Sequence, residues 1–143
     1  MTEILCIDPG PATSGVVEYS AGLRSVIQAE SAMANIRIGA GSNAFSGDTV
    51  LIEMIASYGM PVGKDVFETC VWIGRLVEYL GNDRCRLIYR RDVKLTLCGT
   101  ARAKDANVRQ AVIDRFAATG GGKVPQIGTK SQPGPLYGVS SHA

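Results

Sequence analysis

Short apolar runs separated by turn residues occupy the first part of the chain. The runs Glu3–Ile7, Ser14–Tyr19 and Leu23–Gln28 are separated by Pro9-Gly10-Pro11 and by Ala21-Gly22. Runs of this length bounded by Gly and Pro are typical of β-strands, and short connections join antiparallel neighbours. The pattern therefore predicts a meander of three antiparallel strands.

Strands then alternate with helices. Thr49–Ile55 is apolar on both faces, which predicts a central strand. Lys64–Leu80 carries apolar residues at helical spacing and is followed by Gly81-Asn82, a common helix stop. Cys85–Tyr89 has the pattern of a fifth strand.

Four further segments have weaker patterns. We expect a helix over Ser31–Ile38, a loop over Gly39–Gly47, a short helix that Asp92 N-caps and that ends before Gly99, and a helix over Lys104–Ala118. Lys123–Gly138 is rich in Gly, Pro, Gln, Ser and Thr, which predicts a loop or a disordered segment.

A run of strands followed by alternating helices and strands indicates an α/β layer around a mixed sheet. We expect the fourth and fifth strands to lie parallel to the first, joined by a crossover helix. The length of 143 residues is that of a single domain, over residues 1–143.

Two of the apolar runs end in a carboxylate. Asp8 follows Ile4-Leu5-Cys6-Ile7, and Glu53 follows Val50-Leu51-Ile52. A carboxylate at the end of a buried strand lies at the rim of the sheet, where it costs free energy unless something pairs with it. A divalent metal shared by both acids is the simplest partner, and two solvated loop acids are the alternative.

Basic residues are concentrated in the second half of the chain. The net charge is only +2, but eleven of the 15 Lys and Arg residues lie between Arg84 and Lys130. This asymmetry indicates an anionic partner such as nucleic acid, with a solvated basic face as the alternative.

The four cysteines, Cys6, Cys70, Cys85 and Cys98, form no Cys-x-x-Cys pair, and the chain has a single histidine. A structural zinc site is therefore not expected. We expect reduced thiols in a cytoplasmic protein instead. We find no signal-peptide pattern and no apolar run of the roughly 18 residues that a membrane span needs.

The order of these motifs resembles that of the RuvC-type Holliday junction resolvases of the ribonuclease H-like superfamily. Ile7-Asp8-Pro9-Gly10 with Ser14-Gly15 is similar to the family's first block, and Ile52-Glu53 is similar to its Ile-Glu-Gln. Arg91-Asp92-Val93-Lys94-Leu95-Thr96 with Gly99, followed by Ala103-Lys104 and Val108, is similar to its third block. The three blocks together cover most of the chain.

The resemblance implies a ribonuclease H-like fold and a Mg²⁺-dependent endonuclease, with Mn²⁺ as an alternative ion, that cuts branched DNA as a homodimer. Asp8 and Glu53 would be catalytic metal ligands. Lys94 and Lys104 would be catalytic lysines at the phosphates of the scissile region. The candidate DNA-binding residues are Lys94, Lys104, Arg91, Arg102 and Tyr58.

The C-terminus departs from the family pattern. The family's last helix opens with Asp-Ala-Ala-Asp, and here the corresponding place is Ser140-Ser141-His142-Ala143. His142 is a candidate metal ligand in place of the first acid, because imidazole binds divalent metals. The second acid has no counterpart, so the last helix is expected to be missing or truncated in this sequence.

Other positions keep two interpretations. Gly10 allows close approach of a phosphate or simply makes a turn. Asp105 is either a further ligand or an acid at a helix start. Tyr58 and Met60 either stack on an unpaired base or pack on their own helix, while Phe67 and Trp72 serve the core or a dimer.

Two rival functions remain. A non-catalytic nucleic-acid-binding relative would keep the fold without the last acid, and metal-dependent nicking separates it from a nuclease. An actin-like ATPase shares the Asp-x-Gly strand end but needs a second lobe, which 143 residues cannot supply; ATP turnover would reveal it.

Overall fold

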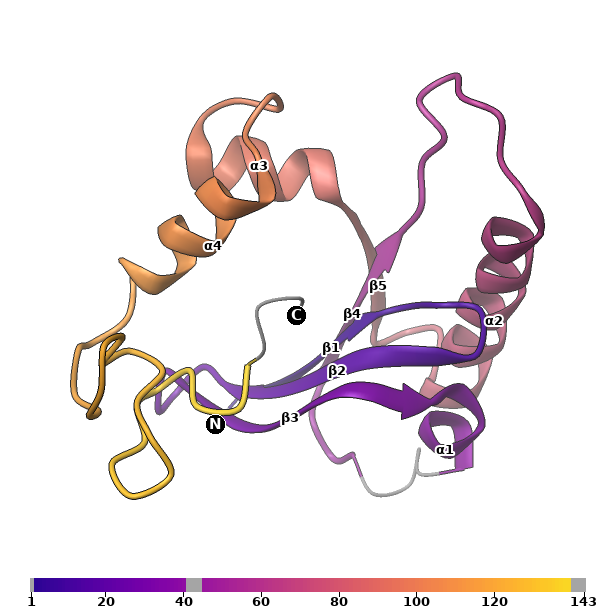
Figure 1. The fold of residues 1–143 in the computed structure, drawn as a ribbon. Coiled ribbons are helices and arrows are strands. Elements are labelled where there is room, and N and C mark those ends of the chain that lie inside the picture. The colour runs from indigo at the N-terminus through magenta and orange to yellow at the C-terminus, as the bar shows by residue number, and fades with distance from the viewer. Residues whose placement is uncertain (1, 41–44, 140–143) are drawn as a thin grey trace.

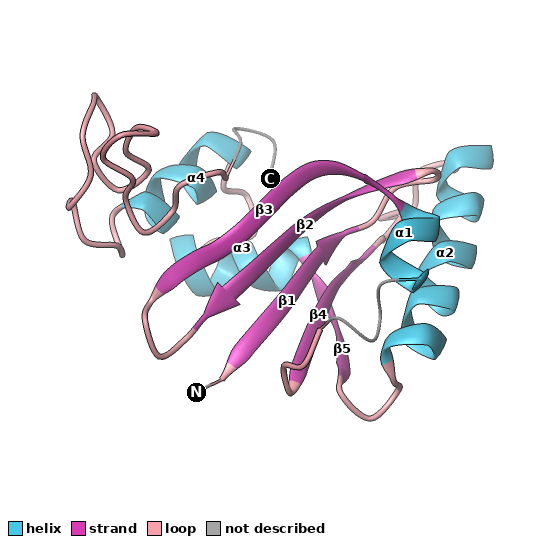
Figure 2. Cartoon of the chain, turned by 90° about the horizontal axis from the view of Figure 1, so that it is seen from below, coloured by secondary structure: helices cyan, strands magenta, loops and turns pink. Residues whose placement is uncertain are grey.

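The computed structural model describes residues 2–40 and 45–139 and contains a five-stranded mixed sheet in the order β3-β2-β1-β4-β5 (Figures 1 and 2). The strands are β1 (Glu3–Asp8), β2 (Thr13–Ser20), β3 (Ser25–Ala34), β4 (Thr49–Met54) and β5 (Cys85–Tyr89). β1 pairs antiparallel with β2, and β2 with β3, whereas β1, β4 and β5 run parallel. The predicted fold class is confirmed, including three antiparallel strands and two strands parallel to the first.

Helices lie on both sides of this sheet. On one side are α1 (Asn35–Ala40) and α2 (Lys64–Leu80), the crossover helix between β4 and β5 (Figures 1 and 2). On the other side, beyond the end of β5, are α3 (Arg90–Cys98) and α4 (Asp105–Ile113). The bounds predicted for α2 and β5 agree with the structure.

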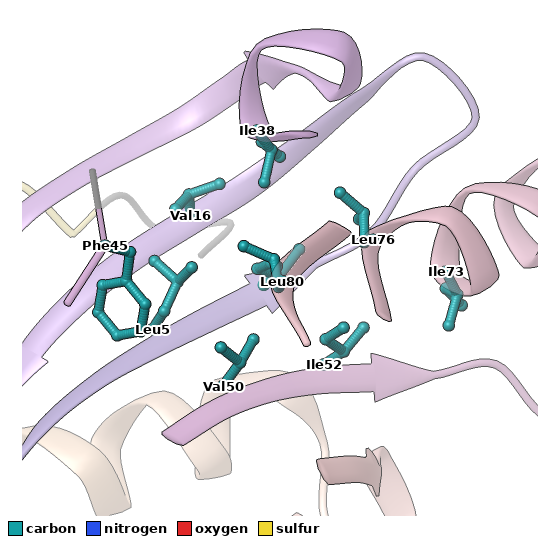
Figure 3. Packing of buried hydrophobic residues seen from close by; sticks show 10 residues of the cluster. Leu5, Val16, Ile38, Phe45, Val50, Ile52, Ile73, Leu76 and Leu80 are labelled. Atoms are coloured by element: carbon teal, nitrogen blue, oxygen red, sulfur yellow. The ribbon is translucent and has the colours of Figure 1, made fainter. Parts of the chain in front are cut away.

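The hydrophobic core lies between the sheet and α1 and α2. Val50 and Ile52 of β4 and Leu76 of α2 are 0% exposed, and Leu5 of β1 packs beside them (Figure 3). Ile7 of β1 belongs to the same buried cluster. Side chains alternate between the two faces of a strand. Because Ile7 and Ile52 face this core, the next residues, Asp8 and Glu53, face the opposite side, where α3 and α4 lie.

The third strand and the first helix differ from prediction. β3 continues to Ala34, and α1 starts only at Asn35, so the predicted helix over Ser31–Ile38 is wrong over its first half. Pairing with β2 extends from Ser25 opposite Ser20 to Ala34 opposite Thr13. The polar residues of this edge strand weaken its sequence pattern, and hydrogen bonding to β2 determines its conformation.

The predicted ends of α3 and α4 also need correction. α3 starts at Arg90 with Tyr89 as its N-cap, so Asp92 lies in the first turn and is not the cap. α4 ends at Ile113 rather than Ala118. At its start the N-cap is Lys104, whose backbone N–H donates to Asn107 Oδ1 at 3.0 Å. An asparagine at the third helical position thus replaces a capping side chain.

The segment from Gly120 to Val139 is a loop with defined internal contacts. Backbone hydrogen bonds join Gly120 to Pro125, and Leu136 to Gln126, and the side chain of Leu136 is buried. Pro135 O accepts from Val26 N of β3 at 2.7 Å. The prediction of a loop is confirmed, and these contacts fix the loop against the sheet.

Within the described residues no helix is long and apolar enough to cross a membrane. All four cysteines are free thiols and are partly buried. Burial raises the pKa of the Cys6 and Cys85 thiols, which disfavours their thiolates.

Candidate active site

The two candidate acids are neighbours because their strands are parallel and in register. Ile7 of β1 pairs with Ile52 of β4, so Asp8 and Glu53 follow side by side. The carboxyl ends of parallel strands meet at one edge of a sheet, which is where ligands usually bind in α/β folds. The structure brings these two predicted site residues together.

Partial burial affects both carboxyl groups. The Glu53 side chain is 29% exposed, and Asp8 is more open. Desolvation raises the pKa of each, and the positive charge of Arg90 opposes this effect. Repulsion from Asp8 and, more weakly, from Asp105 raises the pKa of Glu53 further. The site is therefore an acidic cluster whose charges repel one another, as expected of groups that bind a cation.

Arg90 lies between these acids, a position that the sequence analysis did not single out. Its Nε is 3.2 Å from Glu53 Oε1, and its Nη1 is 3.5 Å from both carboxylate oxygens of Asp105. Arg90 directly follows β5, whose last residue, Tyr89, pairs with Met54 of β4. The available signal was therefore positional: Arg90 comes directly after a strand that neighbours the Glu53 strand.

Asp105 and Lys94 complete this cluster. Asp105 is the first residue of α4 and is 76% exposed, so its predicted position at a helix start is correct, although it is not the N-cap. Lys94 Nζ lies 4.0 Å from Asp105 Oδ1, and its side chain is only 20% exposed. The Asp105 carboxylate thus contacts both Lys94 and Arg90, and Arg90 in turn pairs with Glu53.

The other candidate DNA-binding residues lie further out. Lys104 is exposed beside Asp105, while Arg91 on α3 and Arg102 between α3 and α4 are also exposed. Together with Lys94 they make the side of the molecule that carries α3 and α4 basic. None of them has an ion pair with a described residue other than the Lys94–Asp105 pair.

A buried polar network holds the turn after Asp8. Asn35, which is 1% exposed, accepts from Ser14 Oγ at 2.5 Å and donates to Gly10 O at 2.8 Å. Gly10 N donates to the same hydroxyl at 3.3 Å, and Asn35 N donates to Ala12 O. No local sequence pattern marks Asn35, because its side-chain partners are 21 and 25 residues away.

Two glycines lie close to Asp8, and only one of them, Gly10, has no room for a side chain. A Cβ at Gly10 would lie 2.4 Å from Thr13 O, so the turn itself excludes a side chain there. Gly15 pairs with Asp8 across β1 and β2, and a Cβ at Gly15 would meet Asp8 Cβ at 3.6 Å. Gly10 is therefore required by the turn, whether or not a phosphate approaches it.

The loop between β4 and α2 projects from the body of the protein (Figure 1). Its tip is a turn closed by Met60 N donating to Ser57 O, with positive φ at both Tyr58 (50°) and Gly59 (80°). Consecutive positive φ values are characteristic of a type I′ turn, which favours Asn or Gly over an aromatic residue. Tyr58 and Met60 are 64% and 67% exposed, so packing of either on α2 is not observed.

The outer face of α2 carries exposed apolar side chains. Phe67 is 62% exposed and Val71 is 61% exposed, so Phe67 does not serve the core. Trp72 is partly buried, with the Arg75 guanidinium 4.8 Å from the centre of its ring.

The candidate ligand His142 lies outside the described residues. In the part of the chain that the structure describes, no cluster of three or more His, Cys, Asp or Glu side chains is arranged to hold a metal ion. Asp8 and Glu53 are two adjacent carboxylates at the ends of β1 and β4.

No family model matches this chain, and no curated protein is significantly similar to it. Solved structures, in contrast, are similar to it in fold. The structure of Thermus thermophilus RuvC superposes with a TM-score of 0.62 at 14% identity, covering 79% of each chain. T. thermophilus RuvC in complex with a Holliday junction substrate gives a TM-score of 0.54 at 15% identity, covering 80% of this chain and 79% of that one. The chain has the RuvC-like form of the ribonuclease H fold.

The network around Asn35 predicts the effect of a single substitution. Asn35→Ala leaves the Ser14 hydroxyl and the Gly10 carbonyl without their buried partner, which costs about 1–3 kcal/mol of unfolding free energy. Gln28→Ala removes an exposed bond to Glu18 and should change this free energy by less than about 0.5 kcal/mol. Urea denaturation measures both, and equal stability of the two variants would contradict the role assigned to Asn35.

Proposed function

We propose that this protein is a metal-dependent endonuclease that cleaves branched DNA at a four-way junction. The observation that carries the proposal is the pair of adjacent carboxylates, Asp8 and Glu53, at the carboxyl edge of two parallel strands. The fold is that of RuvC, and one of the similar solved structures is a complex with a Holliday junction substrate. The basic residues of α3, α4 and their connection provide charge of the sign that DNA needs.

The donor set fits a hard divalent cation. Mg²⁺ is commonly held by one or two carboxylates together with water and substrate phosphate, and the side chains of Asp8 and Glu53 supply such oxygens. Mn²⁺ prefers similar ligands. His142 is a further candidate ligand from the C-terminal residues. When bound, such cations activate water and stabilise the leaving oxygen in phosphodiester hydrolysis.

The protein's own residues position the substrate. Lys94 is held against Asp105 close to the acids, so its ammonium lies beside the expected position of the scissile phosphate. Lys104, at the start of α4, extends this positive charge outward, and Arg91 and Arg102 are suited to more distant phosphates. The acids come from the sheet, and the lysines come from α3 and the start of α4, so the DNA strand would lie between these two layers.

The projecting loop is suited to the junction centre. An exposed tyrosine on a tight turn can stack on a base that lacks a stacking neighbour, with about 1–3 kcal/mol per base. The unfavourable backbone conformation of Tyr58 supports a functional role, because strained residues are retained where function requires them.

A homodimer fits both the substrate and α2. A four-way junction has two-fold symmetry, and two symmetric cuts require two active sites related by a two-fold axis. Phe67 and Val71 are one helical turn apart on α2 and both exposed, which gives an apolar strip for an isologous contact.

Loss of either acid should stop the reaction. We expect Asp8→Asn and Glu53→Gln each to reduce Mg²⁺-dependent cleavage of a four-way junction by more than about 100-fold, because second-shell changes alone cost 10–100-fold. The double variant should be no worse than either single one, since groups that act as a unit are not additive. Cleavage of a labelled junction measures this, with the exposed carboxylate variant Asp114→Asn as control. Normal junction binding without metal-dependent nicking by the unmodified protein would favour the non-catalytic relative.

Removal of the lysines separates chemistry from binding. Lys94→Ala and Lys104→Ala should reduce cleavage more than junction affinity. Each should also reduce the salt dependence of log K by about one unit if the lysine contacts phosphate. Arg37→Ala, which removes a positive charge on α1 on the other side of the sheet, should change neither. Unchanged cleavage and salt slope in both lysine variants would show that these side chains are only solvated.

Tyr58 can be tested without disturbing the turn. Asn accepts positive φ, so Tyr58→Asn should keep or raise stability while lowering junction affinity by about 5- to 100-fold through lost stacking. Tyr58→Phe should retain the affinity of the unmodified protein. Fluorescence anisotropy with a labelled junction gives the affinities, and equal affinity of the Asn and Phe variants would refute stacking.

The dimer is tested by a charge in the apolar strip. We expect sedimentation at micromolar concentration to show a dimer, and Val71→Glu to shift it toward monomer because the substitution buries an unpaired carboxylate in the contact. Leu23→Glu, at an exposed position in the turn between β2 and β3, serves as control. A monomer that remains monomeric on junction DNA would exclude this interface.

A further inference from the structure

Arg90 occupies the centre of the acidic cluster. Glu53 from β4 and Asp105 from α4 come from segments 52 residues apart in sequence, and the same guanidinium reaches both, at 3.2 Å and 3.5 Å. It therefore links the sheet to the α3–α4 layer through two ion pairs. Together with Asp8, these two acids carry three negative charges, and Arg90 and Lys94 carry two positive charges beside them.

The backbone and the side chain of Arg90 differ in freedom. The backbone directly continues β5, where Tyr89 pairs with Met54, so its place beside Glu53 is set by the sheet. The side chain is half exposed and ends in a guanidinium that can retain one partner while releasing the other. Glu53 is the less exposed partner, and Asp105 is mostly in solvent.

A divalent ion and this guanidinium require the same carboxylate. Two cations on one carboxylate repel each other, and the repulsion is stronger in a partly desolvated site. An arginine stays charged at any pH at which the protein is folded, so it cannot make room by losing a proton. It can only move.

We propose that Arg90 is a displaceable internal cation, which holds Glu53 in the metal-free protein and must release it, keeping Asp105, before a divalent ion can bind. Arg90 is thus a positioning residue that sets the metal affinity of the site. The inference rests on the proposed function, because it takes Asp8 and Glu53 as the metal ligands. Asp105 would affect metal binding only through Arg90, because without Asp105 the guanidinium has only Glu53 to pair with.

Titration of the protein with Mn²⁺ alone, followed by calorimetry and without DNA, tests the inference. Arg90→Ala should bind Mn²⁺ about tenfold more tightly than the unmodified protein, which corresponds to about 1.4 kcal/mol. Arg37→Ala removes an arginine from an exposed ion pair with Glu30 and should leave the Mn²⁺ affinity within about twofold, a range expected of a remote surface charge. Equal or weaker Mn²⁺ binding by Arg90→Ala overturns the inference.

Asp105 provides a second test that a purely structural role would not satisfy. Asp105→Asn should weaken Mn²⁺ binding in the unmodified background and have no effect in the Arg90→Ala background, as a double-mutant cycle shows. An equal loss in both backgrounds would make Asp105 a ligand and overturn its assigned action through Arg90. Arg90→Gln, which keeps much of the side-chain stem, replaces Arg90→Ala in the cycle if the latter fails to fold.

Glu53→Gln separates failure of this inference from failure of the proposed function. If Glu53→Gln abolishes Mn²⁺ binding while Arg90→Ala leaves it unchanged, the metal site stands and the role of Arg90 is wrong. If neither Asp8→Asn nor Glu53→Gln alters Mn²⁺ binding, the proposed metal site is wrong, and the inference fails with it.

Discussion

Repulsion between two carboxylates held side by side is the constraint on which the site depends. Parallel pairing of β1 with β4 places Asp8 next to Glu53, and neither strand can shift without moving its buried residues, Ile7 and Ile52, out of the core. The free energy of burying Val50 and Ile52 of β4 against Leu76 of α2 therefore maintains a pair of acids that would separate in solution. Partial burial raises the pKa of both acids, because desolvation disfavours their charged forms.

The two faces of the sheet have different functions for this reason. The face toward α1 and α2 is apolar and fixes the register. On the other face, Asp8 lies beside its cross-strand partner Gly15, and the turn that follows Asp8 is held by the Asn35 network at the start of α1. α3 and α4 bring Lys94, Arg90 and Asp105 toward the acids from the end of β5. Catalytic groups in the proposed nuclease are thus supplied by a rigid sheet on one side and by short basic helices on the other.

Arg90 connects the geometry of the acidic cluster with the proposed reaction. It compensates part of the negative charge of the cluster and joins β4 to α4 through two ion pairs. In our proposal, the same pairing lowers the affinity of Glu53 for a metal cation. An acidic site for a weakly held ion such as Mg²⁺ needs this kind of balance, because uncompensated acids would destabilise the fold and fully compensated ones would not bind metal.

The sequence by itself determined the strand order along the chain, the long helix Lys64–Leu80 and the acids at the ends of two apolar strands, because these features depend on local periodicity and on turn residues. From the same pattern follow the mixed sheet and the adjacency of Asp8 and Glu53, since parallel strands align their carboxyl ends. The extent of β3, the N-caps at Tyr89 and Lys104, and the end of α4 at Ile113 were decided by tertiary contacts. Tertiary contacts also decided the buried Asn35 network and the position of Arg90. The hydrogen-bond partners of these two residues lie 15 to 37 residues away in sequence and become neighbours only when the sheet and its helices pack.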